Sequence, residues 1–250
     1  MSEQANTGRG GAIGENIRTI GYALLIALII RAFFFQPFNI PSSSMVPTLL
    51  VGDYLFVSKF SYGYSKHSLP FSPPIFDGRI LARQPHRGDV VVFKKPTDNR
   101  TDFIKRLIGL PGDRIQMKDG VLYLNDTAVS KVRIEDFVER DEFGSVIRVP
   151  QYRETLPNGV TYTTLDFQQN GDLDNTDVYV VPPGHYFMMG DNRDNSMDSR
   201  VPSVVGYVPF ENLVGKAEII FFSTDGSAHF WEFWRWPSSI RWNRILMWVD

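Results

Sequence analysis

The sequence of 250 residues contains no cysteine and only four histidines. Without cysteine the chain forms no disulfide, holds no thiolate-bound metal and has no cysteine nucleophile. The histidines are scattered, with neither His-x-His nor His-x-x-x-His spacing, so we expect no catalytic zinc. Their positions are His67, His86, His185 and His229. We predict that the protein works without a metal or other cofactor.

The chain also lacks an excess of charge of either sign, with a formal net charge of −2 at pH 7. Phosphate binding needs a basic surface, so we expect no nucleic-acid partner. Hydrophobic residues make up 43% of the chain and charged residues 22%, as in an ordinary globular protein. A chain of this length has room for one large all-β domain or two small domains.

One apolar segment near the N-terminus predicts a helix over residues 17–36. Its span is roughly 28 Å at about 1.5 Å per residue, just enough for a bilayer core of about 30 Å. Arg18 and Arg31 lie near its ends, where long side chains reach the headgroups. A buried core helix and a cleaved secretory signal are the alternatives. A cleavage site needs small residues one and three positions before the cut, and the residues from Ile30 to Phe35 do not fit this pattern. We therefore predict an uncleaved anchor behind a cytoplasmic tail, residues 1–16.

Most of the remaining chain predicts a mostly β fold with an antiparallel catalytic core. Short runs are rich in β-branched and aromatic residues, and Gly and Pro punctuate the chain between them. Lys118-Asp119-Gly120 is a hairpin turn signal. The predicted strands are Asp53–Lys59, Asp89–Lys94, Asp113–Met117, Val121–Leu124, Tyr186–Met189 and Ala217–Phe222.

Residues 131–180 are more polar and less regular, which indicates an insertion or cap on the core. The core then comprises residues 37–130 and 181–222, and a Trp-rich segment follows at 223–250. All five tryptophans lie in that last segment. Trp242, Ile245, Leu246 and Val249 have helical spacing, which predicts a short amphipathic helix. It either lies at a membrane interface or packs on its own domain.

A run of three serines stands a few residues after the anchor. The residues from Pro41 to Thr48 read Pro-Ser-Ser-Ser-Met-Val-Pro-Thr, which puts a candidate nucleophile just outside a membrane surface. A serine hydroxyl is a poor nucleophile until a base takes its proton, and no histidine or cysteine nearby in the sequence offers one.

A lysine flanked by apolar residues is the candidate base. Lys105 lies in the run from Asp102 to Asp113, next to Phe103, Ile104 and Leu107. Apolar surroundings disfavour a charged amine and lower its pKa. A drop of about two units raises the neutral fraction about a hundredfold, so the amine can accept a serine proton. The alternative is a surface lysine on a strand edge.

The third run, from Gly190 to Arg200, reads Gly-Asp-Asn-Arg-Asp-Asn-Ser-Met-Asp-Ser-Arg. A calcium loop of the EF-hand type requires Gly at its sixth position and Glu at its twelfth. Counting from Asp191 gives Ser196 and Pro202 at those positions, so the pattern fails.

In this order the three runs resemble type I signal peptidases, membrane-bound serine proteases that remove signal peptides from exported proteins. The run from Arg87 to Phe93 and the preceding anchor also fit, and the likeness covers roughly residues 17–125 and 180–222. Better-known members have two membrane spans, whereas this chain shows one.

The resemblance implies which residues carry the chemistry. The nucleophile directly precedes Met45 and is therefore Ser44, and Ser42 lends its hydroxyl to the oxyanion hole beside the backbone N–H of Ser44. Lys105 is the general base. Ser43 stands where the family commonly has glycine, and it receives no role.

The resemblance further implies that Ser196 holds the lysine amine in line. Asp198 and Arg200 form a charged pair that braces the loop from Gly190. We also suggest that Arg106 pairs with an acid in this loop, Asp191.

Two shallow apolar pockets would accept small side chains at the first and third positions before the cut, as in Ala-x-Ala. By family analogy one is lined by Phe38, Ile40, Val92 and Ile104, and the other by Met45, Leu49 and Phe103. The resemblance implies a bacterial plasma membrane enzyme, single-pass, with its catalytic domain on the outer, periplasmic face. Its partners would be signal peptides of exported preproteins and the lipid bilayer, with the export machinery a further candidate.

Other protein classes fit less well. Self-cleaving repressors share the Ser-Lys pair but are soluble and begin with a DNA-binding helical domain. Penicillin-binding enzymes use Ser-x-x-Lys, which does not occur in this sequence. A catalytically inactive, membrane-anchored assembly or scaffold protein of the same fold stays open as the alternative function.

Overall fold

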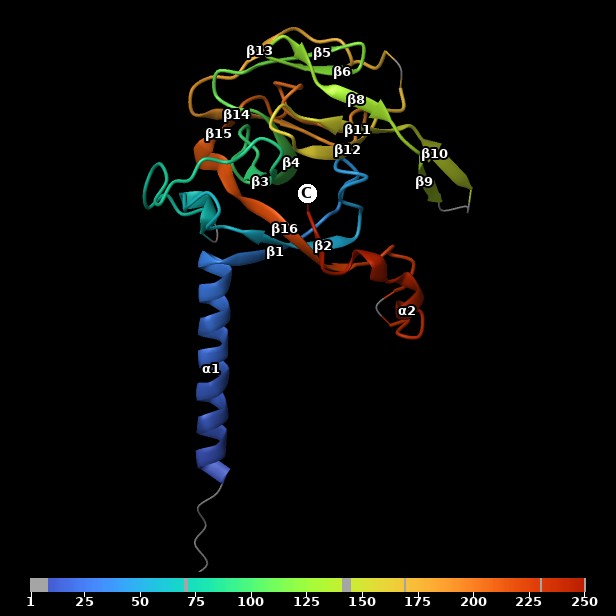
Figure 1. The fold of residues 1–250 in the computed structure, drawn as a ribbon. Helices are drawn as coiled ribbons and strands as arrows, with labels where there is room; N and C mark the ends of the chain where they lie inside the picture. Colours follow the sequence, from blue (N-terminus) through green and yellow to red (C-terminus); the bar gives the residue numbers. More distant parts are fainter. Residues whose placement is uncertain (1–8, 70–71, 141–144, 169, 230, 250) are drawn as a thin grey trace, which may run out of the picture.

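A single long helix, α1 (Arg9–Phe33), projects from a body built of β-strands (Figure 1). The computed structural model describes residues 9–69, 72–140, 145–168, 170–229 and 231–249. Within α1, Gly14–Phe33 is long and apolar enough to cross a membrane, with a mean hydropathy of 1.5, and none of it is buried against the described chain. The helix ends before the predicted residue 36 because β1 (Phe35–Asn39) already pairs with β2 there. The first half of the predicted tail, residues 1–8, lies outside the described residues.

The main sheet has eight strands and is antiparallel. Along its path the order is β1-β2-β16-β3-β4-β14-β15, and β17 pairs with the outer part of β16. The six strands predicted from the sequence are all present, in this sheet or the next, with small shifts at their ends. The bounds here are β1 (Phe35–Asn39), β2 (Asp53–Ser58), β3 (Val90–Lys94), β4 (Asp102–Gly109), β14 (His185–Met189), β15 (Val208–Pro209), β16 (Leu213–Ser223) and β17 (Met247–Trp248).

Three smaller sheets lie at the end of the body away from α1 (Figure 1). Their orders are β13-β5-β6-β7, β12-β11-β8 and β10-β9. The region 131–180 therefore contains more regular strands than its polar sequence indicates. The bounds are β5 (Arg114–Lys118), β6 (Val121–Leu124), β7 (Thr127–Ala128), β8 (Ser130–Arg133), β9 (Phe137–Arg140), β10 (Val146–Val149), β11 (Gln151–Thr155), β12 (Thr161–Leu165) and β13 (Tyr179–Val180).

Alternation of apolar side chains explains how the main sheet is buried on both faces. Val90 and Val92 of β3 join one buried cluster with Leu55, while Val91 joins another with Leu107. A third cluster lies beneath β5 and β6. The predicted turn between those two strands is present, with positive φ at Asp119 and Gly120 as a tight hairpin requires.

The predicted C-terminal amphipathic helix is wrong. The segment contains only one turn of helix, α2 (Trp236–Ser239), then the 3-10 turn η3 (Trp242–Arg244) and the strand β17. Trp242 and Leu246 are exposed while Val249 is buried in the core, so the stripe does not form one face. The reason is tertiary: Arg244 makes a buried ion pair with Asp53, 2.6 Å between Nη2 and Oδ2, and β17 pairs with β16. Two further 3-10 turns are η1 (Lys66–Ser68) and η2 (Phe210–Asn212).

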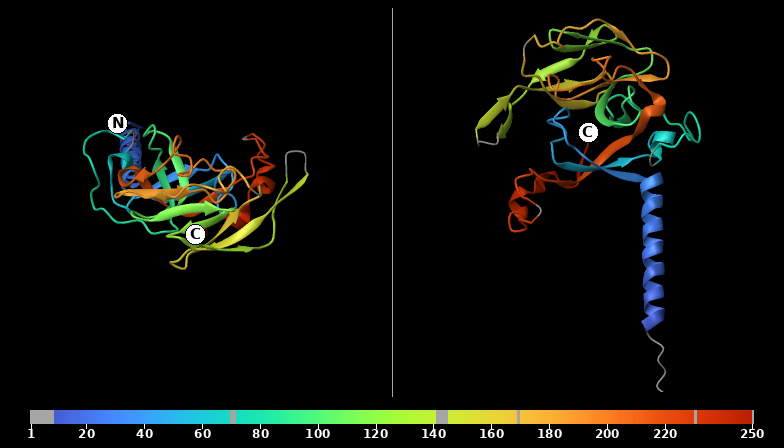
Figure 2. Two further views of the ribbon diagram at one scale, coloured as in Figure 1. Left: turned by 90° about the horizontal axis from the view of Figure 1, so that it is seen from above. Right: turned by 180° about the vertical axis from the view of Figure 1, so that it is seen from behind.

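Viewed from the front and from behind, α2 and its flanking residues lie on the same side of the body as α1 (Figures 1 and 2). Exposed aromatic side chains gather in this segment, and they are Trp231, Phe233, Trp234, Trp236, Trp242 and Trp248. Whether this segment contacts lipid stays a prediction.

Candidate active site

The loop between β1 and β2 brings Ser44 against Lys105 of β4. Lys105 Nζ lies 2.5 Å from Ser44 Oγ and 3.0 Å from the carbonyl oxygen of Ile104. Two side chains of this loop, Met45 and Leu49, are fully buried in the core and anchor the loop there. Lys105 is held by pairing of β4 with strands on both sides, and it lies opposite Val91 of β3. Two groups 61 residues apart thus meet at hydrogen-bond distance.

Both side chains are buried, Ser44 at 7% and Lys105 at 4% exposure. Burial lowers the pKa of Lys105 to about 8, an effect that the nearby carboxylates of Asp198 and Asp191 oppose. Desolvation disfavours the charged amine, so it outweighs the attraction to these anions. At pH 7 roughly one amine in ten is then neutral, against a few in ten thousand for an unperturbed lysine.

The two neighbouring serines differ in their contacts. Ser42 Oγ lies 3.5 Å from Ser44 Oγ, so both hydroxyls reach the same place. Ser43 turns to the 190–200 loop instead: its Oγ accepts a hydrogen bond from Asn195 Nδ2 at 2.7 Å, and its carbonyl accepts one from Asn192 Nδ2 at 3.1 Å. The two asparagines, to which the sequence assigned no role, join this loop to the serine run.

The 190–200 loop, which comprises residues 190–200, is tied together by a buried ion pair. Arg200 binds both carboxylate oxygens of Asp198, at 2.9 Å from Nε and 2.8 Å from Nη2, and donates to the carbonyl of Arg193 at 2.7 Å. Asp198 also accepts the backbone N–H of Gly190 at 3.0 Å. Burial alone would raise the pKa of Asp198, but the Arg200 guanidinium reverses this and holds it below its usual value.

Gly190 is required because other atoms lie close to its Cα, and not because its backbone has a positive φ. A Cβ at this position would lie 2.2 Å from Ser196 Oγ and 2.5 Å from the carbonyl oxygen of Ser44. No real side chain fits there, so the glycine lets the 190–200 loop approach the serine run.

Ser196 lies beside Lys105 in the cavity wall, but the predicted hydrogen bond between them is absent. Ser196 Oγ is buried and makes no hydrogen bond of good geometry to a described residue, although the hydroxyl lies close enough to the Asp198 carboxylate to help lower the pKa of that group. The lysine amine is oriented in the structure by Ser44 and by the Ile104 carbonyl.

The suggested pairing of Arg106 with Asp191 is present. Arg106 Nε and Nη2 donate to the two carboxylate oxygens of Asp191 at 2.9 and 2.7 Å, and Nη1 donates to the Gly88 carbonyl at 2.8 Å. Thr48 Oγ1 donates to the same carboxylate at 2.5 Å. This cluster links β4, the serine run and the 190–200 loop directly behind Lys105.

A cavity of about 850 Å³ opens in front of Ser44 and Lys105. Of the seven residues predicted to line substrate pockets, five lie in its wall: Phe38, Ile40, Val92, Phe103 and Ile104. Met45 and Leu49 do not line this cavity. They are fully buried in the core, because the loop that exposes Ser44 turns them inward.

Three carboxylates, one of which lines the cavity, form a cluster with the geometry to hold a cation. Asp166, Asp174 and Asp194 offer oxygens within 4.8 Å of one another. Each carboxylate already accepts a hydrogen bond from the protein. Asp166 accepts one from the Lys131 ammonium, and Asp174 and Asp194 accept theirs from backbone N–H groups. The Ser44–Lys105 contact needs no metal.

A serine hydroxyl held against a buried lysine amine beside an apolar cavity is the arrangement of a serine peptidase. The family model described as "Signal peptidase, peptidase S26" matches residues 13–222. The chain belongs to this family, which is the family predicted from its motifs.

Relatives of similar length carry the same description. Signal peptidase I of Rickettsia typhi is 44% identical over 227 residues, covering 88% of this chain and 84% of its own. Signal peptidase I of Rickettsia canadensis is 39% identical over 265 residues, with 98% and 97% covered. A crystal structure of a signal peptidase I from Enterococcus faecalis is 25% identical and covers 54% of this chain and 97% of its own, and its TM-score of 0.31 is too low to compare the folds. The protein is thus a peptidase that removes signal peptides from preproteins.

Proposed function

We propose that Ser44 is the nucleophile and neutral Lys105 the general base of this signal peptidase. The observation that carries the proposal is the 2.5 Å contact between Ser44 Oγ and the buried Lys105 Nζ. General-base catalysis needs this distance, and a lowered pKa supplies the neutral amine.

The mechanism follows from this contact. Ser44 Oγ attacks the carbonyl carbon of the scissile bond while Lys105 Nζ takes its proton. The Ser42 hydroxyl and the Ser44 backbone N–H hold the oxyanion, each donor contributing about 3 kcal/mol. Lys105 then gives the proton to the leaving amine, and water attacks the acyl-enzyme with Lys105 again as base. Ser196 is assigned a supporting part as an acceptor for the charged lysine amine, because its buried hydroxyl lies in the same cavity wall as Lys105.

The cavity walls support cleavage after small residues. Phe38, Val92 and Ile104 are apolar and anchored in the sheet, so a large side chain would clash with them, while a small one keeps the cavity dry around Lys105. This selection matches substrates with small residues at the first and third positions before the cut.

The anchor and aromatic segment support a membrane location. The Gly14–Phe33 segment has the length and composition of one span, and the exposed aromatic residues around α2 lie on its side of the body. We assign the catalytic body to the outer face of a bacterial plasma membrane, with lipid touching both elements.

Serine substitutions test the assignment in detergent with a purified preprotein. Ser44→Ala should abolish cleavage, because no other hydroxyl lies at hydrogen-bond distance from the amine within the described chain. Ser43→Ala is the matched control and should keep most activity, since it loses only a contact at the surface. If both variants cleave like the wild type, the site is misassigned.

A further inference from the structure

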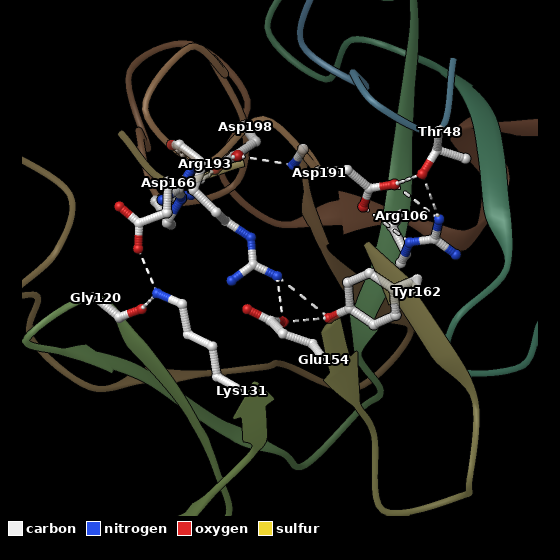
Figure 3. A network of polar contacts seen from close by, with 12 residues as sticks. Thr48, Arg106, Gly120, Lys131, Glu154, Tyr162, Asp166, Asp191, Arg193 and Asp198 are labelled. Atoms are coloured by element: carbon white, nitrogen blue, oxygen red, sulfur yellow. Dashed lines mark hydrogen bonds and ion pairs between the residues drawn. The ribbon is translucent and has the colours of Figure 1, made fainter. Parts of the chain in front are cut away.

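The three-stranded sheet β12-β11-β8 contributes no reacting group, yet its buried polar side chains point toward Arg193 of the 190–200 loop (Figure 3). Glu154 of β11 binds Arg193 of the 190–200 loop, with Oε2 2.6 Å from Nη2. The hydroxyl of Tyr162 of β12 donates to the same carboxylate oxygen at 2.8 Å and lies 3.2 Å from Arg193 Nη2. All three residues are at most 4% exposed.

Tyr162 also touches the residue that follows the general base. Its ring lies under the Arg106 guanidinium, 4.3 Å from the ring centroid. Arg106 in turn holds Asp191 at the start of the 190–200 loop. Tyr162 therefore contacts both β4, which carries Lys105, and, through Arg193, the 190–200 loop.

Backbone pairing strengthens this link. Leu165, at the end of β12, donates its N–H to the Asp191 carbonyl at 2.9 Å and accepts from the Arg193 N–H at 2.9 Å. The end of β12 thus continues as a strand partner for the loop, and Arg193 is fixed at its backbone and at its side chain.

Stability alone is a weak reason for this arrangement. Taking two charges out of water costs several kcal/mol per ion before their attraction compensates, and well-packed apolar residues often stabilise as much or more. What an ion pair provides and an apolar contact does not is direction: Arg193 Nη2 donates to both Glu154 and Tyr162. Arg193 Nε and Nη1 and Glu154 Oε1 are buried without a hydrogen-bond partner among the described residues, so the pair costs stability to keep this direction.

We propose that Glu154, Tyr162 and Arg193 are positioning residues that hold the 190–200 loop and Arg106 behind Lys105, so that the amine stays against Ser44 and out of water. This inference rests on the proposed Ser44–Lys105 chemistry. It gives the inserted strands a part in catalysis: their polar side chains set the alignment of the base.

The test is the kinetics of single variants of the full-length enzyme in detergent. Glu154→Gln leaves Arg193 as an uncompensated buried cation, which competes with Arg106 for Asp191. We expect kcat to fall about tenfold with KM changed less than about threefold. The ascending limb of kcat against pH should move to higher pH, because a loosened loop admits water to Lys105 and raises its pKa. Tyr162→Phe keeps the ring under Arg106 and loses only the hydroxyl, so it should fold and show a smaller change in the same direction.

Two further variants separate positioning from stability. Val129→Ala truncates a buried apolar side chain next to β8 of the same sheet, away from the cavity, and it should lower Tm while leaving kcat and its pH profile unchanged. The apolar triple variant Glu154→Leu/Tyr162→Phe/Arg193→Met should recover Tm, yet keep a reduced kcat because the directional link is missing.

The inference is overturned if Glu154→Gln and Tyr162→Phe keep wild-type kcat and pH profile, or if kcat returns in the triple variant together with Tm. Such results alongside an inactive Ser44→Ala would leave the proposed function standing. Activity in Ser44→Ala would instead remove the proposed function.

Discussion

At the residue scale, burial of Lys105 lowers the stability of the folded protein and, in the proposed mechanism, makes the amine a base. Its pKa of about 8, lowered from 10.5 by burial, means that the folded protein holds a charged amine at neutral pH at a cost. The unfolded chain binds more protons than the folded one between about pH 8 and 10.5, so stability rises with pH there. Below pH 8 the full penalty applies, at most about 3 kcal/mol for a shift of this size.

Lys105→Met should therefore be inactive but more stable than the wild type at pH 7. The gain should stay below the full penalty, because the contacts with Ser44 and the Ile104 carbonyl are lost. It should shrink as the pH rises from 8 to 10.5. Thermal unfolding of both proteins across this range measures the difference. A constant difference in Tm would show that desolvation of the amine is not its source.

The sequence predicts the principal contact at this scale but not its surroundings. Ser44 and Lys105 are each marked by their local run, serines before Met45 in one case and apolar neighbours in the other. Glu154 and Arg193 are 39 residues apart, and neither is unusual within its own run. Their pairing depends on how the inserted strands fold over the loop, which no local pattern encodes.

At the element scale, strands were predictable because alternation and composition agree with burial. β3 and β16 are rich in β-branched and aromatic residues, and both are central in the sheet. The C-terminal segment was not predictable in this way. Helical spacing from Trp242 to Val249 is overridden by the buried Arg244–Asp53 pair and by pairing of β17 with β16.

The close contact between the 190–200 loop and the serine run predicts a severe effect of Gly190→Ala. The added methyl group would overlap Ser196 Oγ and the Ser44 carbonyl oxygen, so the loop must move away. We expect a loss of kcat of about a hundredfold or more with a folded protein. Kinetics together with circular dichroism measure this.

Gly171→Ala is the matched control for Gly190→Ala. It lies at the same cavity and meets its nearest atom, an Asp194 side-chain oxygen, at 3.2 Å. It should retain most activity. Equal activity in the two variants would contradict the close-approach argument.

At the scale of the whole molecule, α1 and the aromatic segment around α2 lie on the same side of the body (Figures 1 and 2). Two contacts with one bilayer would fix the tilt of the body, whereas one helix would leave it free to swing. The cavity would then keep a constant height above the membrane, at the level where the junction between a signal peptide and the exported chain lies.

Tryptophan fluorescence tests this second contact, because all five tryptophans lie between residues 231 and 248. In full-length enzyme reconstituted into vesicles, brominated lipids should quench the tryptophan emission. The tryptophans should also be quenched less by acrylamide, a water-soluble quencher, than in the same enzyme kept in mild detergent. Exposed indole rings favour the membrane interface because each has an apolar ring and a polar N–H group. Emission that responds to acrylamide alone would place the segment in water.

The most direct measurement is the pH dependence of kcat/KM for a preprotein peptide without groups that titrate between pH 6 and 10. If neutral Lys105 is the base, the rate climbs about tenfold per pH unit at low pH and levels off around the lysine pKa of about 8. A profile that is flat from pH 6 to 9 would mean that no such amine controls the reaction, and the Ser44–Lys105 mechanism would be wrong.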